Sequence, residues 1–247
     1  MSERFDCLII DDEQVLADNT CEYFNIFDVK TQAVYSKADA LSFFEENKAS
    51  LILLDINLGD GSGFELCKLI RQTLNIPILF ISARNTDDDK IIALNIGGDD
   101  YIEKPYSLGV LLAKVKVTLR RFAQVSDNAG SDENPAGGTA SDTSSGMYDD
   151  GHIRFDYTNR TLQVEGQEKK LTSLEYTLLW YLIENKDRLI TKMELFDNVW
   201  KDKFTSDGTL NVHIRKIREV IEPDPQNPKY ILTVWKEGYK FISGAHT

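Results

Sequence analysis

Residues 51–55, Leu51-Ile52-Leu53-Leu54-Asp55, are four apolar residues followed directly by a carboxylate, and the rest of the first half of the chain is arranged around them. A short, continuous apolar run bounded by turn residues is typical of a strand that is buried on both faces, as in a parallel sheet. Asp55 then lies at the carboxyl edge of the sheet, which is where open α/β sheets bind ligands. Aspartate also ends strands because it suits turns, so Asp55 alone leaves a chemical and a structural role open.

Four further apolar runs recur at near-even intervals. They begin at Cys7, Thr31, Ile76 and Tyr101, and helical patterns of apolar residues lie between them. Alternation of strands and helices is typical of an α/β fold. We therefore predict a doubly wound, five-stranded parallel sheet in the first half of the chain.

Polar side chains follow several of these runs and would meet at one edge of the sheet. Asp11 and Asp12 follow the first run, Asp55 the third, Ser82 the fourth and Lys104 the fifth. Three neighbouring carboxylates repel one another, so their grouping predicts a hard divalent cation, with Mg²⁺ expected because it shares itself with phosphate oxygens. With Ser82 and Lys104 to contact phosphoryl oxygens, the set predicts phosphoryl transfer to Asp55 as nucleophile. For each residue alone, a solvated helix start or a surface position remains the alternative.

The same residues carry a resemblance to a known family. Ile10-Asp11-Asp12-Glu13, the Asp55 strand, Ser82-Ala83-Arg84 and the stretch from Gly97 to Tyr106 resemble the receiver domain of bacterial two-component response regulators, a flavodoxin-like fold. The resemblance covers residues 4–122. It implies a phosphoacceptor at Asp55, Mg²⁺ held by Asp11, Asp12, Asp55 and the backbone carbonyl of Asn57, switch residues Ser82 and Tyr101, and a phosphate-sensing Lys104 with a cis peptide to Pro105. Gly59, Gly98 and Tyr106 depart from the family's usual proline, alanine and phenylalanine, which concerns loop stiffness and not the chemistry.

Two other functions compete with this interpretation. An aspartyl phosphohydrolase also uses a strand-end aspartate, but commonly has a second aspartate two residues later as general acid. Asn57 stands in that place, so we expect no turnover enzyme, only Mg²⁺-dependent self-phosphorylation at Asp55 and slow autodephosphorylation. A DNA-binding protein that works without phosphorylation stays open as the second alternative.

Charge is unevenly distributed along the 247 residues. The net charge is −12, of which residues 1–122 carry −7, residues 123–150 carry −6 and residues 151–247 carry +1. The last segment is therefore the one that can best meet a polyanion.

No apolar run approaches the length of a membrane span and the start resembles no signal peptide, so we expect a cytoplasmic protein without membrane contact. Three cysteines without metal-ligand spacing suggest reduced core residues.

A change in composition predicts the domain boundary. Residues 123–150 are rich in serine, glycine and acidic residues, which cannot bury a core, so we predict a flexible, self-repelling tether. The chain then divides into a receiver domain at 1–122, the tether at 123–150 and a second domain at 151–247.

The second domain contains a predicted helix from about Ser206 to Ile221 with two different faces. Leu210, Ile214, Ile217 and Ile221 recur at helical spacing and predict the core face. The opposite stripe combines amide and guanidinium groups, which suit the major groove and its phosphates, although an ordinary solvated face is the alternative. Its members are Asn211, Arg215 and Arg218, flanked by His213 and Lys216.

A predicted hairpin after three predicted helices indicates an α+β winged helix-turn-helix domain. The hairpin runs from Tyr230 to Ile242 and turns at Trp235-Lys236-Glu237-Gly238. Together with Leu171–Tyr176, Thr209–Ile214 and Glu222–Pro225, it resembles the OmpR/PhoB-type effector domain over residues 152–243. The resemblance implies base-edge contacts from Asn211, Val212 and Lys216 and phosphate contacts from Thr209, His213, Arg215 and Arg218. Gly208 and Trp235-Lys236 depart from frequent arginine positions, so Lys236 would replace the wing arginine only electrostatically.

The two resemblances together imply a phosphorylation-dependent transcriptional regulator of a two-component system. A histidine kinase would phosphorylate Asp55, and the receivers would then dimerise through the face of the fourth helix, fifth strand and fifth helix. Paired winged helices would bind tandem half-sites of promoter DNA, with RNA polymerase as a further partner. Across the dimer we expect the ion pairs Asp100–Lys114 and Asp99–Lys116. A third pair is missing because Lys90 would face Val110, so we expect a weaker dimer than in typical relatives.

Overall fold

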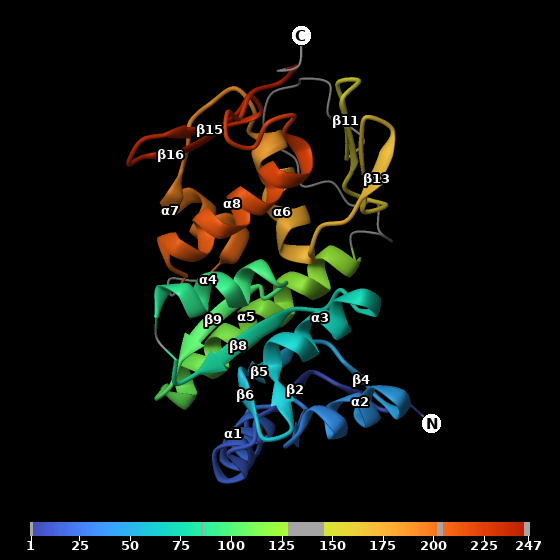
Figure 1. The fold of residues 1–247 in the computed structure, drawn as a ribbon, viewed down its shortest axis with the longest axis vertical. Coiled ribbons are helices and arrows are strands. Elements are labelled where there is room, and N and C mark those ends of the chain that lie inside the picture. Colours follow the sequence, from blue (N-terminus) through green and yellow to red (C-terminus); the bar gives the residue numbers. More distant parts are fainter. Residues whose placement is uncertain (1, 85, 128–145, 202–204, 245–247) are drawn as a thin grey trace. The chain divides into compact units, whose positions relative to one another are not determined.

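The computed structural model describes residues 2–84, 86–127, 146–201 and 205–244 (Figure 1). It separates into two compact units. The first ends in the long helix α5 (Leu108–Asp127), and the second begins with strand β10 (Met147–Asp149). Both elements extend into the range predicted as a tether, so the tether prediction was too long at both ends. Its remaining part, 128–145, lies outside the described residues.

A five-stranded parallel sheet forms the centre of the N-terminal unit. The strand order is β3-β2-β5-β8-β9, with the first strand of this sheet between the second and the third, so the chain winds in both directions as predicted. The apolar runs recognised in the sequence supply all five strands: β2 (Cys7–Ile10), β3 (Thr31–Val34), β5 (Ile52–Asp55), β8 (Ile78–Ser82) and β9 (Asp100–Glu103).

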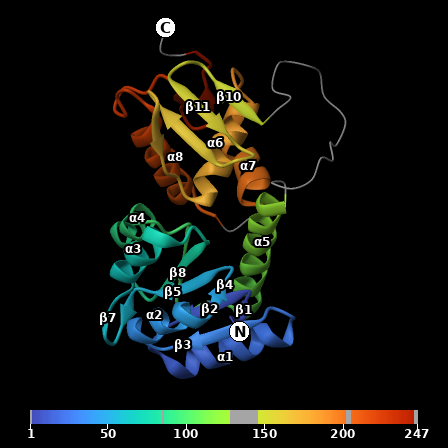
Figure 2. The ribbon, with the colours of Figure 1, turned by 90° about the vertical axis from the view of Figure 1, so that its right-hand side faces the viewer.

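Helices cover both faces of this sheet, because successive side chains of a strand point to opposite faces. In β2, Leu8 and Ile10 pack in a core with α2 (Lys37–Glu46), α3 (Gly63–Thr73) and α4 (Asp87–Asn95). Cys7 and Ile9 point into a second core with α1 (Gln14–Ile26) and α5. Figure 2 shows α3 and α4 on the side of the sheet opposite α5. Two short ladders, β1 (Arg4–Phe5) with β4 (Lys48–Ala49) and β6 (Asn57–Leu58) with β7 (Gly61–Ser62), complete the unit.

The start of α3 lies directly against the end of β5. The amide of Gly63 donates a hydrogen bond of 2.8 Å to the carbonyl oxygen of Ile56. A Cβ atom on Gly63 would lie 1.9 Å from the carbonyl oxygen of Asp55, a distance at which no side chain fits. Glycine therefore allows the helix to begin beside the residue that the sequence predicts to be chemically active.

The C-terminal unit has the predicted winged-helix architecture. An antiparallel sheet of β10, β11 (Ile153–Asp156), β12 (Thr161–Val164) and β13 (Gln167–Lys169) precedes the helices. The helices are α6 (Ser173–Glu184), α7 (Lys192–Leu195), which continues as the π-helical turn η1 (Phe196–Trp200), and α8 (Asp207–Ile221). The wing is the hairpin of β15 (Ile231–Val234) and β16 (Gly238–Phe241), with β14 (Ile190–Thr191) paired to β16.

Local signals explain where the helices of this unit begin. Thr172 caps α6 in a reciprocal capping box with Glu175, and Thr191 caps α7. Strand β13 ends at Lys169, three residues before this cap. The predicted core face of α8 is confirmed, since Leu210, Ile214, Ile217 and Ile221 are all buried in the hydrophobic core of the unit.

Candidate functional site

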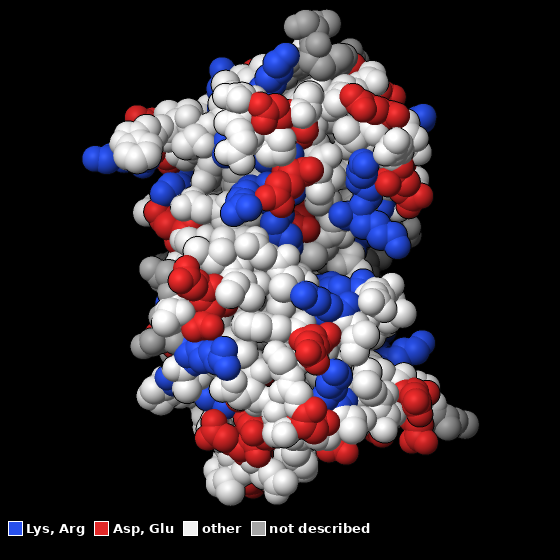
Figure 3. All heavy atoms as spheres, viewed as in Figure 1, with Lys and Arg blue, Asp and Glu red and all other residues white. Residues whose placement is uncertain are grey.

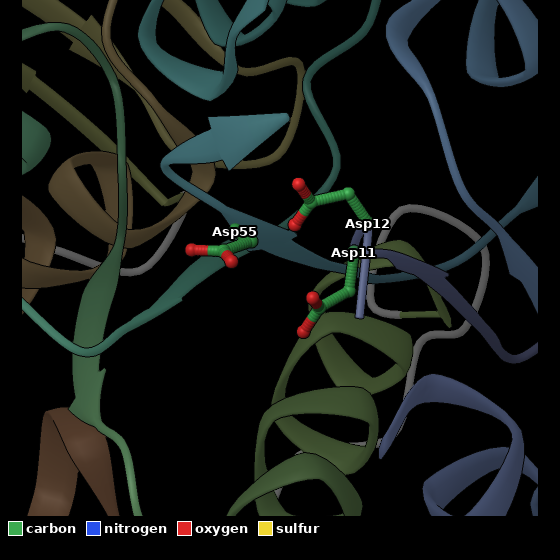
Figure 4. Close-up of side chains that lie close together, drawn as sticks. All are labelled: Asp11, Asp12 and Asp55. Carbon is green, nitrogen blue, oxygen red and sulfur yellow. The ribbon is translucent and has the colours of Figure 1, made fainter. Parts of the chain in front are cut away.

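Three carboxylates gather where β2 and β5 end. Asp11 and Asp55 are buried and Asp12 is exposed, and each offers an oxygen that lies within 4.8 Å of the others. Figure 4 shows the three side chains around one small region. Carboxylate oxygens are the ligands that hard divalent cations prefer, so this donor set fits such an ion.

The ammonium group of Lys104 offsets part of the negative charge of this cluster. Its Nζ lies 2.7 Å from Oδ2 of Asp11, 2.8 Å from Oε1 of Glu13 and 3.0 Å from Oδ2 of Asp55. Burial by itself lowers the pKa of Lys104, but the hydrogen bonds to the three carboxylates outweigh it and raise the pKa above its ordinary value. Burial in turn raises the pKa of Asp11, although Lys104 opposes it. Sequence reasoning missed Glu13, whose signal was its place directly after the two aspartates.

Backbone groups orient Asp55 within the cluster. Its Oδ1 accepts a hydrogen bond of 2.6 Å from the amide of Ile56, while Oδ2 faces Lys104. The peptide bond between Lys104 and Pro105 is cis, as the family resemblance implied. The arrangement presents a carboxylate oxygen beside a fixed positive charge, which suits transfer of an anionic group.

The predicted switch residues lie on the neighbouring strands and are connected through Arg84. Ser82 is buried, and its hydroxyl accepts a hydrogen bond of 3.2 Å from the amide of Arg84. Tyr101 donates its hydroxyl hydrogen to the carbonyl oxygen of Arg84. The guanidinium of Arg84 donates to Oδ1 of Asn57 at 2.9 Å. Arg84 therefore links the loop after β8 to the loop after β5, next to the acidic cluster.

In the C-terminal unit, the buried carboxylate of Glu175 holds two predicted DNA contacts. Nζ of Lys216 lies 2.5 Å from Oε1 of Glu175, and Nδ1 of His213 donates to the same oxygen at 3.4 Å. His213 is fully buried and packs beside Trp200, with ring centroids 6.0 Å apart. The prediction of a phosphate contact from His213 is therefore wrong, because the side chain points into the core.

Two other residues of α8 connect this helix to the wing. Tyr239 donates its hydroxyl hydrogen to Oδ1 of Asn211 at 2.7 Å. Nε of Arg218 donates to the carbonyl oxygen of Ile231 at 3.0 Å, and Nη2 donates to the hydroxyl of Thr233 at 2.9 Å. The guanidinium of Arg218 thus binds the wing, and the phosphate contact that the resemblance implies for Arg218 stays a prediction.

The remaining predicted DNA contacts lie on the first turns of α8 and at the wing. Thr209 and Val212 lie on the first two turns and are 5% and 8% exposed, so the base-edge contact that the resemblance implies for Val212 is corrected, because its side chain is buried. The hydroxyl of Thr209 is 3.2 Å from that of Ser206. Arg215 is exposed and pairs with Glu219 one turn later. Lys236 is exposed in the turn of the wing, and Figure 3 shows basic atoms at the outer end of the β15–β16 hairpin.

Known proteins share both units. The profile "Response regulator receiver domain" matches residues 7–116, and the profile "Transcriptional regulatory protein, C terminal" matches residues 166–241. Sensory transduction protein RegX3 of Mycolicibacterium smegmatis is 35% identical over 94% of this chain and 97% of the relative. Regulatory protein VanRc of Enterococcus gallinarum is 33% identical over 97% of this chain and 98% of the relative.

The chain belongs to the OmpR/PhoB-type response regulators. A solved structure of a RitR mutant shares the fold, with a TM-score of 0.70 at 23% identity over 96% of this chain and 98% of that one. The regulator thus joins a receiver domain to a transcriptional regulatory domain, as in two-component systems. Across the residues that the structure describes, no helix has the length and apolar character needed to cross a membrane.

Two of the predicted dimer contacts of this response regulator are engaged elsewhere in the receiver. Asp99 is buried, accepts from Nη2 of Arg71 at 2.7 Å and also accepts from the amide of Ile78 at 2.9 Å. Nζ of Lys116 lies 5.9 Å from the centroid of the Phe27 ring on α1. The expected pair Asp99–Lys116 is corrected accordingly, because Asp99 is not available to a partner receiver.

The other predicted dimer residues form ion pairs within one receiver. Lys114 lies 2.6 Å from Oδ2 of Asp100, between α5 and β9. Lys90 of α4 lies 2.5 Å from Oε1 of Glu103 at the end of β9. Each of these lysines would have to exchange its partner, or share it, in order to contact a second receiver.

Proposed function

We propose that Asp55 of this response regulator accepts a phosphoryl group from a histidine kinase. The observation that supports this most directly is the contact of 3.0 Å between Oδ2 of Asp55 and Nζ of Lys104 inside an acidic cluster. A bond forms between phosphorus and a carboxylate oxygen of Asp55, and the bond from phosphorus to the histidine nitrogen of the kinase breaks. The nitrogen leaves with the electron pair of that bond.

Asp11, Asp12 and Asp55 fit a divalent cation, and we propose Mg²⁺, with the backbone carbonyl of Asn57 as a further ligand. When bound, the ion supplies positive charge to the oxygens of the transferred phosphoryl group. Lys104 supplies a second positive charge and exchanges its contact with Asp55 for one with the phosphoryl oxygens. This chemistry modifies the protein itself, so we propose no turnover of substrate.

Phosphorylation adds a charge of about −1.5 to −2 beside Ser82 and Lys104. Ser82 donates its hydroxyl hydrogen to the phosphoryl group, and Tyr101 follows Ser82 through the loop that carries Arg84. Because Tyr101 lies on β9, this movement changes the face made by α4, β9 and α5. A two-state change of that face is the step that couples the acidic site to dimerisation.

The dimer then brings two winged helices to tandem half-sites of promoter DNA. Exposed Arg215 and Lys236 contact phosphates, and exposed Asn211 faces a base edge, together with Lys216 after it leaves Glu175. Linking two modules raises the affinity through effective concentration, without new contacts to each half-site. We place the regulator in the cytoplasm, where it meets its kinase, promoter DNA and RNA polymerase.

The test is DNA binding by the full chain before and after treatment with Mg²⁺ and a small phosphodonor. The probe is a duplex enriched by the treated protein from a randomised library, and binding is followed by fluorescence anisotropy. We expect treatment to raise the affinity of the wild type and leave Asp55→Ala unchanged. Equal affinities for all samples would instead favour a DNA-binding protein that works without phosphorylation.

A further inference from the structure

The short ladder of β6 and β7 carries one of the proposed cation ligands, because β6 begins at Asn57. Asn57 and Leu58 pair with the two residues of β7, so Gly59 and Asp60 form the turn between the strands. Leu58 is buried, but Gly59 and Asp60 are exposed. Because a two-stranded hairpin is at best marginally stable by itself, the place of this turn depends on contacts with the rest of the receiver.

The carboxylate of Asp60 anchors the turn to the start of α2. Its Oδ1 accepts a hydrogen bond of 2.8 Å from the amide of Lys37, and its Oδ2 accepts one of 3.0 Å from the amide of Ala38. Amides in the first turn of a helix have no partner within the helix, and the next one, of Asp39, donates to the side chain of Ser36 at 3.0 Å. The bonds from Lys37 and Ala38 lower the pKa of Asp60, so the ionised form holds the turn.

The backbone of the turn has little stiffness of its own. Gly59 stands where the receiver family usually has proline, whose ring would fix one backbone dihedral angle. Glycine is not required by space, because a Cβ atom on Gly59 would lie 3.8 Å from Oδ2 of Asp12, which is an ordinary contact. The same distance places the turn beside the exposed carboxylate of Asp12. Movement of the turn would therefore disturb the surroundings of Asp12 and the backbone of Asn57 together.

We propose that Asp60 is a positioning residue for the cation site. By holding the turn on α2, Asp60 fixes the backbone of Asn57 and the surroundings of Asp12 before a cation binds, so less chain freedom is lost on binding. The anchor supplies the stiffness that glycine at position 59 takes away. This inference rests on the proposed binding of Mg²⁺ by the acidic cluster, and it adds a residue that lies outside the proposed ligand set.

The competing explanation is charge, because removal of any nearby carboxylate weakens the attraction of a cation. Adding Gly59→Pro to Asp60→Ala distinguishes the two explanations, since proline restores stiffness to the turn and restores no charge. Asp39→Asn is the matched control for charge. It removes an exposed carboxylate from the same first turn of α2 and leaves the two hydrogen bonds of Asp60 in place.

Metal affinity of the full chain is the main measurement. Free Mn²⁺ is counted by electron paramagnetic resonance during a titration, Mg²⁺ is added as competitor, and Asp12→Ala gives the background from other carboxylates. We expect Asp60→Ala to weaken Mg²⁺ binding about tenfold, the lower end of the loss for residues that orient metal ligands. Asp60→Ala with Gly59→Pro should recover an affinity within about threefold of the wild type. Gly59→Pro alone and Asp39→Asn should each stay within about twofold of the wild type.

Hydrogen exchange of the amides of Lys37 and Ala38, followed by NMR without metal, reports on the anchor itself. We expect slow exchange in the wild type and in Asp39→Asn, and faster exchange in Asp60→Ala with or without Gly59→Pro. Wild-type metal affinity of Asp60→Ala despite faster exchange would overturn the positioning role, and so would weak binding that Gly59→Pro does not relieve. If the wild type binds no more Mn²⁺ than Asp12→Ala, the proposed cation site itself fails.

Discussion

Nζ of Lys216 lies 2.5 Å from Oε1 of Glu175, so a buried carboxylate in the first turn of α6 holds the centre of α8. Glu175 also accepts a hydrogen bond of 2.8 Å from the amide of Thr172 and contacts His213. One side chain thus caps one helix and positions another. The proposed base-edge contact of Lys216 therefore requires that this ion pair open.

Glu175→Gln is expected to lower the free energy of unfolding by about 3 kcal/mol, as for breaking a buried ion pair. The neutral amide leaves Lys216 without its charged partner and weakens the contact with His213. Chemical denaturation of the full chain measures the change. Glu184→Gln on the same helix is the matched control, and we expect a change within about 0.5 kcal/mol because Glu184 is exposed. Equal losses for the two variants would contradict a special role of Glu175.

The stabilisation by Glu175 should also depend on pH. Burial alone raises the pKa of this carboxyl group, but the hydrogen bond from His213 and the charge of Lys216 outweigh burial and hold the pKa well below its ordinary value of 4.5. The ionised form is therefore favoured in the folded state, so the stabilisation is fully present above pH 4.5 and is lost as the pH falls toward the folded-state pKa. The difference in the free energy of unfolding between wild type and Glu175→Gln should shrink as the pH is lowered below 4.5. A difference that stays constant from neutral pH into this acid range would exclude the charge as its source.

Lys104→Met should destabilise the N-terminal unit more strongly without Mg²⁺ than with it. Removing the ammonium leaves Asp11 and Asp55 close together without a positive charge, which we expect to cost about 2 kcal/mol. Mg²⁺ replaces the lost charge, so thermal unfolding should show a larger rise in Tm with Mg²⁺ for this variant than for the wild type. Lys90→Met, which removes an exposed ion pair with Glu103, should change stability by less than about 1 kcal/mol in either condition. A loss that Mg²⁺ does not reduce would mean that Lys104 acts through packing.

Asp99→Ala is expected to destabilise the receiver by about 3 kcal/mol, because it leaves Arg71 and the amide of Ile78 without their buried partner. Lys116 is the residue that the sequence predicted as the partner of Asp99 across the dimer. Lys116→Ala should change stability by less than about 1 kcal/mol. Denaturant unfolding of both variants gives the comparison. Wild-type stability of Asp99→Ala combined with a weakened phosphorylated dimer would restore the original assignment of Asp99 to the dimer face.

Val110→Glu should strengthen dimerisation of the phosphorylated receiver. Val110 is 44% exposed, and a glutamate there would give Lys90 a partner on the second receiver. An exposed pair contributes about 0 to 1 kcal/mol, so the gain in dimer affinity should reach at most about fivefold. Sedimentation of the phosphorylated protein measures this gain, and adding Lys90→Ala should remove it. A wild-type dimer that is already tight, and that Val110→Glu leaves unchanged, would refute the idea of a weakened dimer.

The sheet and its acidic edge followed from local patterns in the sequence. Each buried strand is a continuous apolar run, and Asp11 and Asp55 come where such runs end, so their meeting at one edge follows from parallel topology alone. The same applies to α8, where helical spacing alone identified Leu210 and Ile214 as core residues.

The predictions for Asp99 and His213 were wrong because a residue distant in the sequence determines whether each side chain is buried. Asp99 is buried because Arg71, 28 residues earlier, reaches it, and no local pattern announces that contact. His213 lies three residues after Leu210 and four before Ile217, so the helical spacing did place it near the core face. A polar side chain is usually assigned to the surface. The partner that allows His213 to be buried, Glu175, lies on another helix, so the local pattern did not reveal it.

The acidic site depends on a residue that has no functional group, because its geometry requires glycine at position 63. Alanine scanning normally deletes atoms, but at this position it adds one, and that atom would lie 1.9 Å from the backbone oxygen of Asp55. The added methyl would push Asp55 away from Lys104 and from Asp11 without altering any charge. A substitution at a residue with no side chain can thus disturb the acidic site while every charged group of that site stays in place.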